Sequence, residues 1–166
     1  YIQKEQNGAV ESSDCVFYCV GTPVGENGCA DLNFLTVAIK ETLSILPKNS
    51  GTTLVVKSTV PPGTLRDRVL PLVCQSGLTP GKDVELANNP EFLREGKCWD
   101  DFINADRLVI GAFTDRGYTQ VAKVYESFSA PVERVNPTTA EFIKYLSNTM
   151  LATMISYSNE MANAAD

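Results

Sequence analysis

Two carboxylates and a guanidinium group occur within residues 89–96, directly after a predicted strand. Pro90 fixes the turn there and favours a short helix, in which Glu91 and Glu95 would lie four residues apart on one face. Like charges at that spacing are mildly destabilising, so a purely structural segment has no reason to contain them. Two carboxylates held at a strand end can divide acid–base and binding roles between them. The alternative is two solvated glutamates on a surface turn.

Hydroxyl groups are concentrated in residues 57–64, around a Pro-Pro-Gly turn that separates a predicted strand from a predicted helix. Helix N-termini carry free N–H groups and partial positive charge, which suit phosphate or a polarised amide. Capping the helix, worth about 1 kcal/mol, needs only one hydroxyl, whereas Ser58, Thr59 and Thr64 lie close together. Ligand binding and plain capping are therefore both open. The turn at residues 20–23 (VGTP), where the backbone could approach a ligand, is open in the same way between ligand binding and an ordinary βα turn.

A long helix is predicted from residue 136 onward, with Asn136 as its cap and Pro137 at its first position. One stripe of apolar side chains forms the expected packing face. This stripe consists of Ile143, Leu146, Met150, Met154, Tyr157 and Met161. The opposite side begins with Glu141, Lys144 and Asn148 and continues with Ala152, Ile155 and Ala162. Because a face turned to water would more often stay charged, we expect a second buried or ligand-facing surface there, the alternative being a solvated face.

The absence of histidine excludes Ser-His and Cys-His catalysis and HExxH zinc sites within this chain, which leaves acid–base work to Glu, Asp, Lys or a thiol. The five cysteines contain no C-x-x-C pair and are interpreted as structural or incidental. No metal site is expected, because Asp100 and Asp101 lack a second pair of ligands and are interpreted as a solvated turn. We interpret Trp99, Phe102 and Tyr118 as core or loop packing.

Composition and charge argue against two classes of partner. A net charge of −6 without any block of Lys or Arg makes nucleic acid an unsuitable partner, although backbone N–H groups could still hold a small anion. No apolar run approaches the roughly 18 residues of a membrane span, and the polar, mixed-charge N-terminus does not resemble a signal peptide. The chain is 43% hydrophobic and 20% charged, as in ordinary globular proteins. We expect it in the cytoplasm, where thiols stay reduced.

Short apolar runs and helical periodicity alternate along the chain. Strands are predicted at residues 15–20, 52–56, 84–87, 107–110 and 130–135, and helices at residues 32–46, 64–76 and 116–128. This alternation indicates βαβ units with right-handed crossovers, and hence an α/β fold with a parallel sheet. Residues 1–12 are interpreted as a frayed lead-in. Because ligands bind beyond the carboxyl ends of parallel strands, the three loops described above are expected to form one site on one rim.

Five segments resemble the nucleotide-sugar 6-dehydrogenases, the UDP-glucose/GDP-mannose dehydrogenase family, in order and at suitable spacing. They are residues 19–23 (CVGTP), 57–64 (KSTVPPGT), 89–96 (NPEFLREG), 106–111 (DRLVIG) and the pattern Glu141-x-x-Lys144-x-x-x-Asn148 followed by residues 158–160 (SNE). The resemblance covers roughly residues 9–166. It implies that residues 1–135 form a partial NAD-binding Rossmann-like domain, the C-terminal half of its parallel sheet. Residues 136–166 would then begin the family's long central helix.

The resemblance implies NAD-dependent oxidation of the C6 alcohol of a UDP- or GDP-linked sugar to the carboxylate, in two hydride transfers through a cysteine-bound intermediate. The implied cofactor-binding residues are Val20, Gly21, Thr22, Pro23, Ser58, Thr59, Val60 and Glu95. The implied substrate-binding residues are Glu91, Phe92, Leu93, Arg94, Lys144 and Asn148. Glu91 would serve as the acid–base group for attack of water on a thioester, with Thr59 positioning that water. Lys144, helped by Asn148, would stabilise developing negative charge.

Two parts of the family pattern are missing from this sequence. The first βαβ unit, with its G-x-G-x-x-G turn, has no match. The family's nucleophile lies in a Gly-rich Ser-Cys segment after the long helix, and none of the five cysteines has that context. We therefore expect an interior fragment that is inactive alone, taken from a cytoplasmic enzyme of polysaccharide biosynthesis. We further expect a homodimer formed through the long helix.

Three other interpretations remain. The chain could be a truncated binding or assembly module without turnover. It could also belong to a β-hydroxyacid dehydrogenase, which shares the Rossmann-plus-long-helix plan and uses a Lys and an Asn on that helix, although residues 89–96 favour the sugar enzyme. Finally, a swapped partner could supply missing strands, since the first predicted strand would otherwise expose a bare edge.

Overall fold

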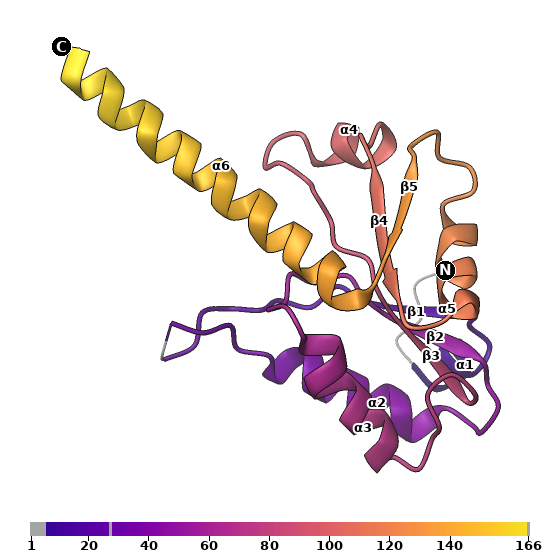
Figure 1. Cartoon of the computed structure of the whole chain (residues 1–166). Helices are drawn as coiled ribbons and strands as arrows, with labels where there is room; N and C mark the ends of the chain where they lie inside the picture. Colours follow the sequence, from indigo (N-terminus) through magenta and orange to yellow (C-terminus); the bar gives the residue numbers. More distant parts are fainter. Residues whose placement is uncertain (1–5, 27, 166) are drawn as a thin grey trace.

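A computed structural model of the chain describes residues 6–26 and 28–165 (Figure 1). The strands are β1 (Cys15–Tyr18), β2 (Thr52–Val56), β3 (Val84–Asn88), β4 (Leu108–Ala112) and β5 (Val132–Val135). The helices are α1 (Gln6–Glu11), α2 (Asn33–Ile45), the π-helical turn η1 (Leu65–Val69), α3 (Leu70–Gln75), α4 (Cys98–Ile103), α5 (Asp115–Val124) and α6 (Pro137–Ala165). The predicted α/β fold with a long C-terminal helix is confirmed.

The five strands form one sheet in the order β1-β2-β3-β4-β5. Strands β1, β2 and β3 are parallel, and β5 is parallel to β4. The expectation of a wholly parallel sheet is wrong at one place, because β4 runs antiparallel to β3 and pairs with it only at Ala87–Ala112 and Asn88–Gly111. The connection from β3 to β4 contains only the short helix α4 and makes no crossover to a parallel neighbour. The chain therefore turns back at the carboxyl rim of β3.

Helices cover both faces of the sheet, with α2 and α3 on one side and α5 on the other (Figure 1). Leu54 and Val56 of β2 belong to the buried cluster that contains residues of α2, η1 and α3. Val55, between them, belongs to the cluster on the α5 side, together with Ile110 and Val121. This alternation follows the two-residue period of a strand. It also accounts for the burial of every residue of the central strands β2, β3 and β4.

Helix α6 is attached to the sheet by its first two turns. Asn136 caps it as predicted, accepting a hydrogen bond from the Thr139 amide at 2.9 Å. Gly111 leaves room for the helix, because a Cβ atom there would lie 2.7 Å from Ala140 Cβ and 2.8 Å from Pro137 Cα. Beyond these turns the helix projects away from the sheet (Figure 1).

The predicted packing stripe of α6 is wrong for contacts within this chain. Its buried residues are Pro137, Ala140, Glu141 and Lys144, on the side expected to be the second surface. The stripe itself is largely exposed, as Leu146, Met150, Met154, Tyr157 and Met161 show. The close approach at Gly111 and the polar contacts of Glu141 and Lys144 decide which side faces the sheet, and apolar periodicity carries no such information.

Several smaller expectations need correction. Part of the predicted frayed lead-in, residues 6–11, forms α1, whereas residues 1–5 lie outside the described part of the chain. Trp99 is 77% exposed, contrary to its interpretation as packing. Phe102 does pack, edge to face on Phe128 with ring centroids 5.3 Å apart, and Tyr118 lies under the Arg134 guanidinium. None of the helices described is long and apolar enough to cross a membrane.

Candidate active site

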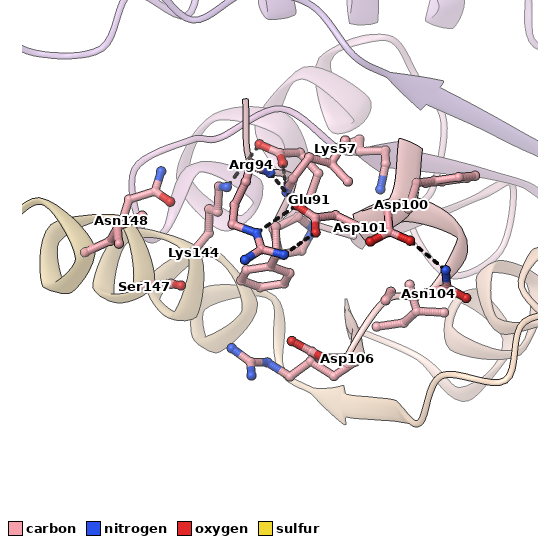
Figure 2. A pocket seen from close by; sticks show the side chains of 18 of the residues that line it. Lys57, Glu91, Arg94, Asp100, Asp101, Asn104, Asp106, Lys144, Ser147 and Asn148 are labelled. Atoms are coloured by element: carbon pink, nitrogen blue, oxygen red, sulfur yellow. Dashed lines mark hydrogen bonds and ion pairs between the residues drawn. The ribbon is translucent and has the colours of Figure 1, made fainter. Parts of the chain in front are cut away.

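A cavity of about 480 Å³ lies beyond the carboxyl end of β3 (Figure 2). Its walls come from the loop that follows β3, from α4, from the residues that lead into β4, and from the first half of α6. Glu91, Phe92, Arg94, Lys144 and Asn148, all expected at the substrate, line it. Leu93, the remaining member of that predicted group, lines it as well. The antiparallel return of β4 thus encloses the site that the sequence placed at this rim.

An ion pair between Glu91 and Lys144, which are 53 positions apart in the sequence, lies in the wall of the cavity. Lys144 Nζ lies 3.0 Å from Glu91 Oε1, and the Lys144 side chain is only 6% exposed. The second oxygen of Glu91 accepts a hydrogen bond from the Leu93 amide at 2.6 Å. Both carboxylate oxygens of Glu91 therefore have defined partners, and its charge is presented in one orientation.

Phe92 lies close to two cations. Lys144 Nζ is 5.5 Å and Arg107 Cζ is 5.1 Å from the centre of its ring. Cations near the face of an aromatic ring are attracted to it by about 0.5–1 kcal/mol at exposed sites. Phe92 therefore supports the orientation of Lys144 in addition to lining the cavity. Asn148, one turn further along α6, borders the same space (Figure 2).

Arg94 closes one side of the cavity by a two-pronged pair with Asp101 of α4. The Nη2–Oδ1 distance is 2.6 Å and the Nε–Oδ2 distance is 3.1 Å, and the Arg94 amide donates to Oδ2 at 2.8 Å. The hydrogen bonds from Arg94 lower the pKa of Asp101 to about 2. Asp101 is thus a structural partner rather than the solvated turn residue expected. Its pairing fixes the loop that carries Glu91.

Lys57 lines the cavity and was assigned no role from the sequence, although it directly precedes the predicted Ser58 site. Its Nζ atom donates to Asn89 Oδ1 at 3.1 Å, and the Tyr125 hydroxyl donates to the same oxygen at 2.6 Å. Burial lowers the pKa of Lys57, an effect opposed by the charge of Glu91, and burial raises the pKa of Tyr125 to about 12. Asn89 also donates to Val109 O at 2.9 Å. This network holds the start of the Glu91 loop.

The expected cofactor loops are brought together at the ends of β1 and β2. Ser58 Oγ donates to Val20 O at 2.6 Å, and Thr22 Oγ1 donates to Thr59 O at 2.8 Å. Within the described residues, these loops do not line the cavity of Glu91 and Lys144. Val60 is buried, whereas Pro23 is exposed. The structure therefore pairs the two loops with each other, beside the cavity, and does not place Thr59 in its wall.

The expectation that Glu91 and Glu95 share a helical face is wrong. Residues 91–94 have no regular secondary structure, and Glu95 begins a turn, is exposed, and lies outside the cavity wall as described. Lys144 and the Leu93 amide bind the Glu91 carboxylate, and these contacts stabilise an irregular loop instead of a helix after Pro90. The helix begins only at α4.

The helix start after Pro61-Pro62-Gly63 neither faces an open ligand site nor is capped by a hydroxyl, the two interpretations that the sequence left open. The amides of Gly63 and Leu65 donate to the Glu141 carboxylate of α6 at 2.5 and 2.8 Å. Thr64 Oγ1 donates to Pro61 O at 2.6 Å instead of capping the helix. Burial raises the pKa of Glu141, and the two amide hydrogen bonds oppose this effect. The N–H groups that suited a phosphate are thus occupied by a protein carboxylate.

Across residues 6–26 and 28–165, no cluster of three or more His, Cys, Asp or Glu could hold a metal ion. In the same residues the cysteines are free thiols, four of them exposed.

Two family models together match nearly the whole chain. The NAD-binding domain of the UDP-glucose/GDP-mannose dehydrogenase family matches residues 2–129, and the central domain of that family matches residues 138–166. This chain belongs to the UDP-glucose/GDP-mannose dehydrogenase family. The resemblance inferred from the five sequence segments is confirmed, and NAD, the expected cofactor, is the ligand named for the larger matched domain.

Individual members of the family agree with this assignment. The chain is 36% identical to the UDP-glucose 6-dehydrogenase of Bacillus subtilis and 38% identical to the GDP-mannose 6-dehydrogenase of Pseudomonas aeruginosa. Each alignment covers 95% of this chain, and it covers 33% and 36% of the two relatives. The chain thus spans about a third of the length of these family members.

Solved structures agree as well. A ternary complex of GDP-mannose dehydrogenase from Pseudomonas aeruginosa superimposes with a TM-score of 0.89 at 35% identity, over 95% of this chain and 37% of that one. The UDP-glucose dehydrogenase of the archaeon Pyrobaculum islandicum gives 0.86 at 39% identity, over 96% and 37% of the two chains. This chain therefore has the fold of the matched third of these structures.

Proposed function

We propose that this chain is part of an NAD-dependent nucleotide-sugar 6-dehydrogenase, which oxidises the C6 alcohol of a UDP- or GDP-linked sugar to the carboxylate. Family membership and the names of the relatives support the reaction class. The observation that carries the proposal is the pair of Glu91 and Lys144, 3.0 Å apart in a cavity that Asn148 also lines. A carboxylate beside an ammonium can divide proton transfer and charge stabilisation between them.

In this proposal Lys144 binds the substrate oxygen at C6 and stabilises the negative charge that develops there, helped by the Asn148 amide. Glu91 accepts the proton of the water that attacks the thioester carbonyl, as the thiolate leaves. Phe92, Leu93 and Arg94 contact the sugar nucleotide. The side chain and the backbone amide of Arg94 both pair with Asp101, which holds this segment at the wall of the cavity.

The proposed NAD-binding residues lie on the paired loops after β1 and β2. They are Val20, Gly21, Thr22, Pro23, Ser58, Thr59 and Val60, with Glu95 as a further contact. The loops fit such a ligand, because a Cβ added at Gly21 would meet no heavy atom within 4 Å, which leaves open space beside that backbone. When bound, NAD supplies the hydride acceptor. Thr59, whose carbonyl holds Thr22, positions a water molecule.

The nucleophilic cysteine is proposed to come from outside these residues. None of the five cysteines follows the Gly-rich Ser-Cys pattern of the family, and none lines the cavity as described. The greater length of the relatives is consistent with this division. The whole active site would then be completed by other segments of the protein.

The reaction is tested by supplying UDP-glucose or GDP-mannose and NAD to the protein expressed from its complete gene, and measuring NADH. We expect two NADH per sugar oxidised with one of the two substrates, and none from residues 1–166 alone. Turnover by residues 1–166 would remove the need for an external cysteine. Binding of a nucleotide sugar without turnover would favour a binding module, and oxidation of a β-hydroxyacid instead would favour the other dehydrogenase class.

We also propose that α6 mediates a homodimer. Its exposed apolar stripe, which contains Met150 and Met154, is a surface of the kind that protein contacts cover. Met154→Glu is expected to shift a dimer to monomer in sedimentation velocity, because a charge in an apolar interface is costly. Thr119→Glu, at an exposed position of α5, serves as the control. A monomeric wild-type protein, or a dimer that tolerates Met154→Glu, would contradict this arrangement.

The remaining expectations also stand as proposals. A division at residues 135/136 is supported by the interval between the two matched models, and limited proteolysis there tests it.

Free thiols support a cytoplasmic location, which fractionation tests. A net charge of −6 argues against a nucleic-acid partner, as a filter-binding assay would show. The product, an activated uronate, is suited to polysaccharide biosynthesis, and loss of uronate from cell polysaccharide on gene deletion tests that role.

A further inference from the structure

We propose that Glu141 is a positioning residue, which holds Lys144 against Glu91 by anchoring α6 to the turn that follows β2. This inference rests on the proposed function, because it assigns Glu141 a role in the same site. Glu141 does not line the cavity, and no role was assigned to it from the sequence beyond its place on the polar side of the helix.

The contacts of Glu141 are unusual for a charged side chain. Glu141 is 1% exposed, and its two oxygens accept hydrogen bonds from the amides of Gly63 and Leu65 at 2.5 and 2.8 Å. A buried carboxylate is costly unless it is hydrogen-bonded. Here the partners are the free N–H groups at a helix start, which also contribute partial positive charge. The neighbouring Arg66 is committed to Asp67, so the backbone amides provide the direct contacts.

The position of Glu141 on α6 links these contacts to Lys144. The two residues are three positions apart, so they lie on the same side of the helix. Ala140, next to Glu141, packs where Gly111 leaves space, and this contact limits translation of the helix toward the sheet. The two directional hydrogen bonds of Glu141 limit rotation about the helix axis. Rotation would carry Lys144 away from Glu91, 3.0 Å from its Nζ atom.

The anchor also joins the two proposed binding regions. Gly63 and Leu65 are separated by two prolines from residues 58–60, which are proposed to contact NAD, whereas Lys144 is proposed to contact the sugar. The hydrogen bonds to Glu141 therefore connect the cofactor loop to the substrate helix. A displacement of only about 1 Å at a reacting group can cost roughly 100-fold in rate. An apolar residue at position 141 could also pack against the turn, but it would fix the rotation of α6 about its axis less narrowly than two hydrogen bonds do.

The test uses the protein expressed from its complete gene. Glu141→Gln keeps the size of the side chain but replaces one acceptor oxygen by a donor that faces an amide. We expect kcat to fall about 10- to 100-fold, with a smaller change in KM for the nucleotide sugar. Glu133→Gln, which neutralises an exposed carboxylate on β5, is the matched control and is expected to keep wild-type kinetics.

A double-mutant cycle separates positioning from a general effect on folding. If Glu141 acts through Lys144, Glu141→Gln should lower kcat no further once Lys144→Ala is present. Multiplied losses in the double variant, or a wild-type kcat in Glu141→Gln, would overturn the inference. If Glu141→Gln does not fold, Glu141→Asp is used, which keeps the charge but shortens the reach, and unchanged kcat in that variant would again overturn it.

The outcomes distinguish this inference from the proposed function. An active wild-type protein with an unaffected Glu141→Gln variant refutes the anchor alone. A wild-type protein without turnover refutes the proposed function, and the anchor is then decided by NMR of residues 1–166. In that case, the NMR spectra of the wild type and of Glu141→Gln are compared. The inference is supported if the Gly63 and Leu65 amide signals and the Lys144 ammonium signal all move from their wild-type positions. An unchanged Lys144 signal refutes it.

Discussion

Replacing Lys144 by alanine is expected to lower kcat about 100- to 1000-fold in the protein expressed from its complete gene, the range seen when one preorganised donor is removed. The ammonium lies 3.0 Å from Glu91 with its side chain 6% exposed, so its electrostatic effect is only weakly screened by water. The NAD loops after β1 and β2 do not include Lys144. We therefore expect the affinity for NAD, measured by calorimetry, to change much less than kcat.

The matched control is Lys123→Ala, which removes an exposed lysine from α5 and should leave turnover unchanged. Folding of the Lys144→Ala variant should be close to wild type, because Glu91 is about one-third exposed and can be hydrated when its partner is gone. Unchanged turnover in Lys144→Ala would remove this residue from the mechanism. Equal losses of turnover and NAD affinity would instead indicate a general disturbance of the site.

Gly111→Ala is expected to lower the free energy of unfolding by about 1–3 kcal/mol, the usual range for overpacking. The added Cβ would lie 2.7 Å from Ala140 Cβ and 2.8 Å from Pro137 Cα, and the second of these is a backbone atom that cannot rotate away. Because α6 must move to relieve the clash, Lys144 should move with it. We therefore also expect a loss of turnover in Gly111→Ala.

Urea unfolding of residues 1–166, followed by circular dichroism, measures the effect on stability. Gly8→Ala is the control, since a Cβ at Gly8 in α1 would meet nothing within 4 Å and alanine favours a helix. Gly111→Ala with wild-type stability would show that α6 does not pack against β4 as described. Wild-type turnover in a destabilised Gly111→Ala variant would show that Lys144 tolerates displacement of its helix.

Local patterns in the sequence were sufficient to predict most of the strands and longer helices and part of the candidate active site. The apolar runs predicted β2 and β3 closely, and Asn136 and Pro137 marked the start of α6. Glu91 and Lys144 were both expected at one rim, and the structure places them in contact. These predictions succeeded because strand period, helix capping and the position of ligands at the carboxyl ends of parallel strands all depend on neighbouring residues or on topology.

Other features depend on partners that are distant in the sequence. Glu91 was expected on a helical face with Glu95, but contact with Lys144 and the Leu93 amide stabilises an irregular loop. Arg94 and Asp101 pair across the cavity edge although no spacing rule relates them. The Lys57–Asn89–Tyr125 network joins three separate elements. None of these contacts has a periodic signal that a reading of the chain could detect.

By itself the sequence determined the α/β class, the start of α6, the family, and the residue types that meet at the rim, because these follow from local periodicity, capping and characteristic segments. Only the tertiary structure decided the antiparallel return of β4, the side on which α6 docks, and the burial of Glu141 against amides 76 and 78 positions away. The physical reason is that apolar spacing indicates that a face can be buried but does not identify its partner. The partner is set by two features of the folded chain. One is the space beside Gly111, which admits Ala140, and the other is the Gly63 amide, which donates to Glu141.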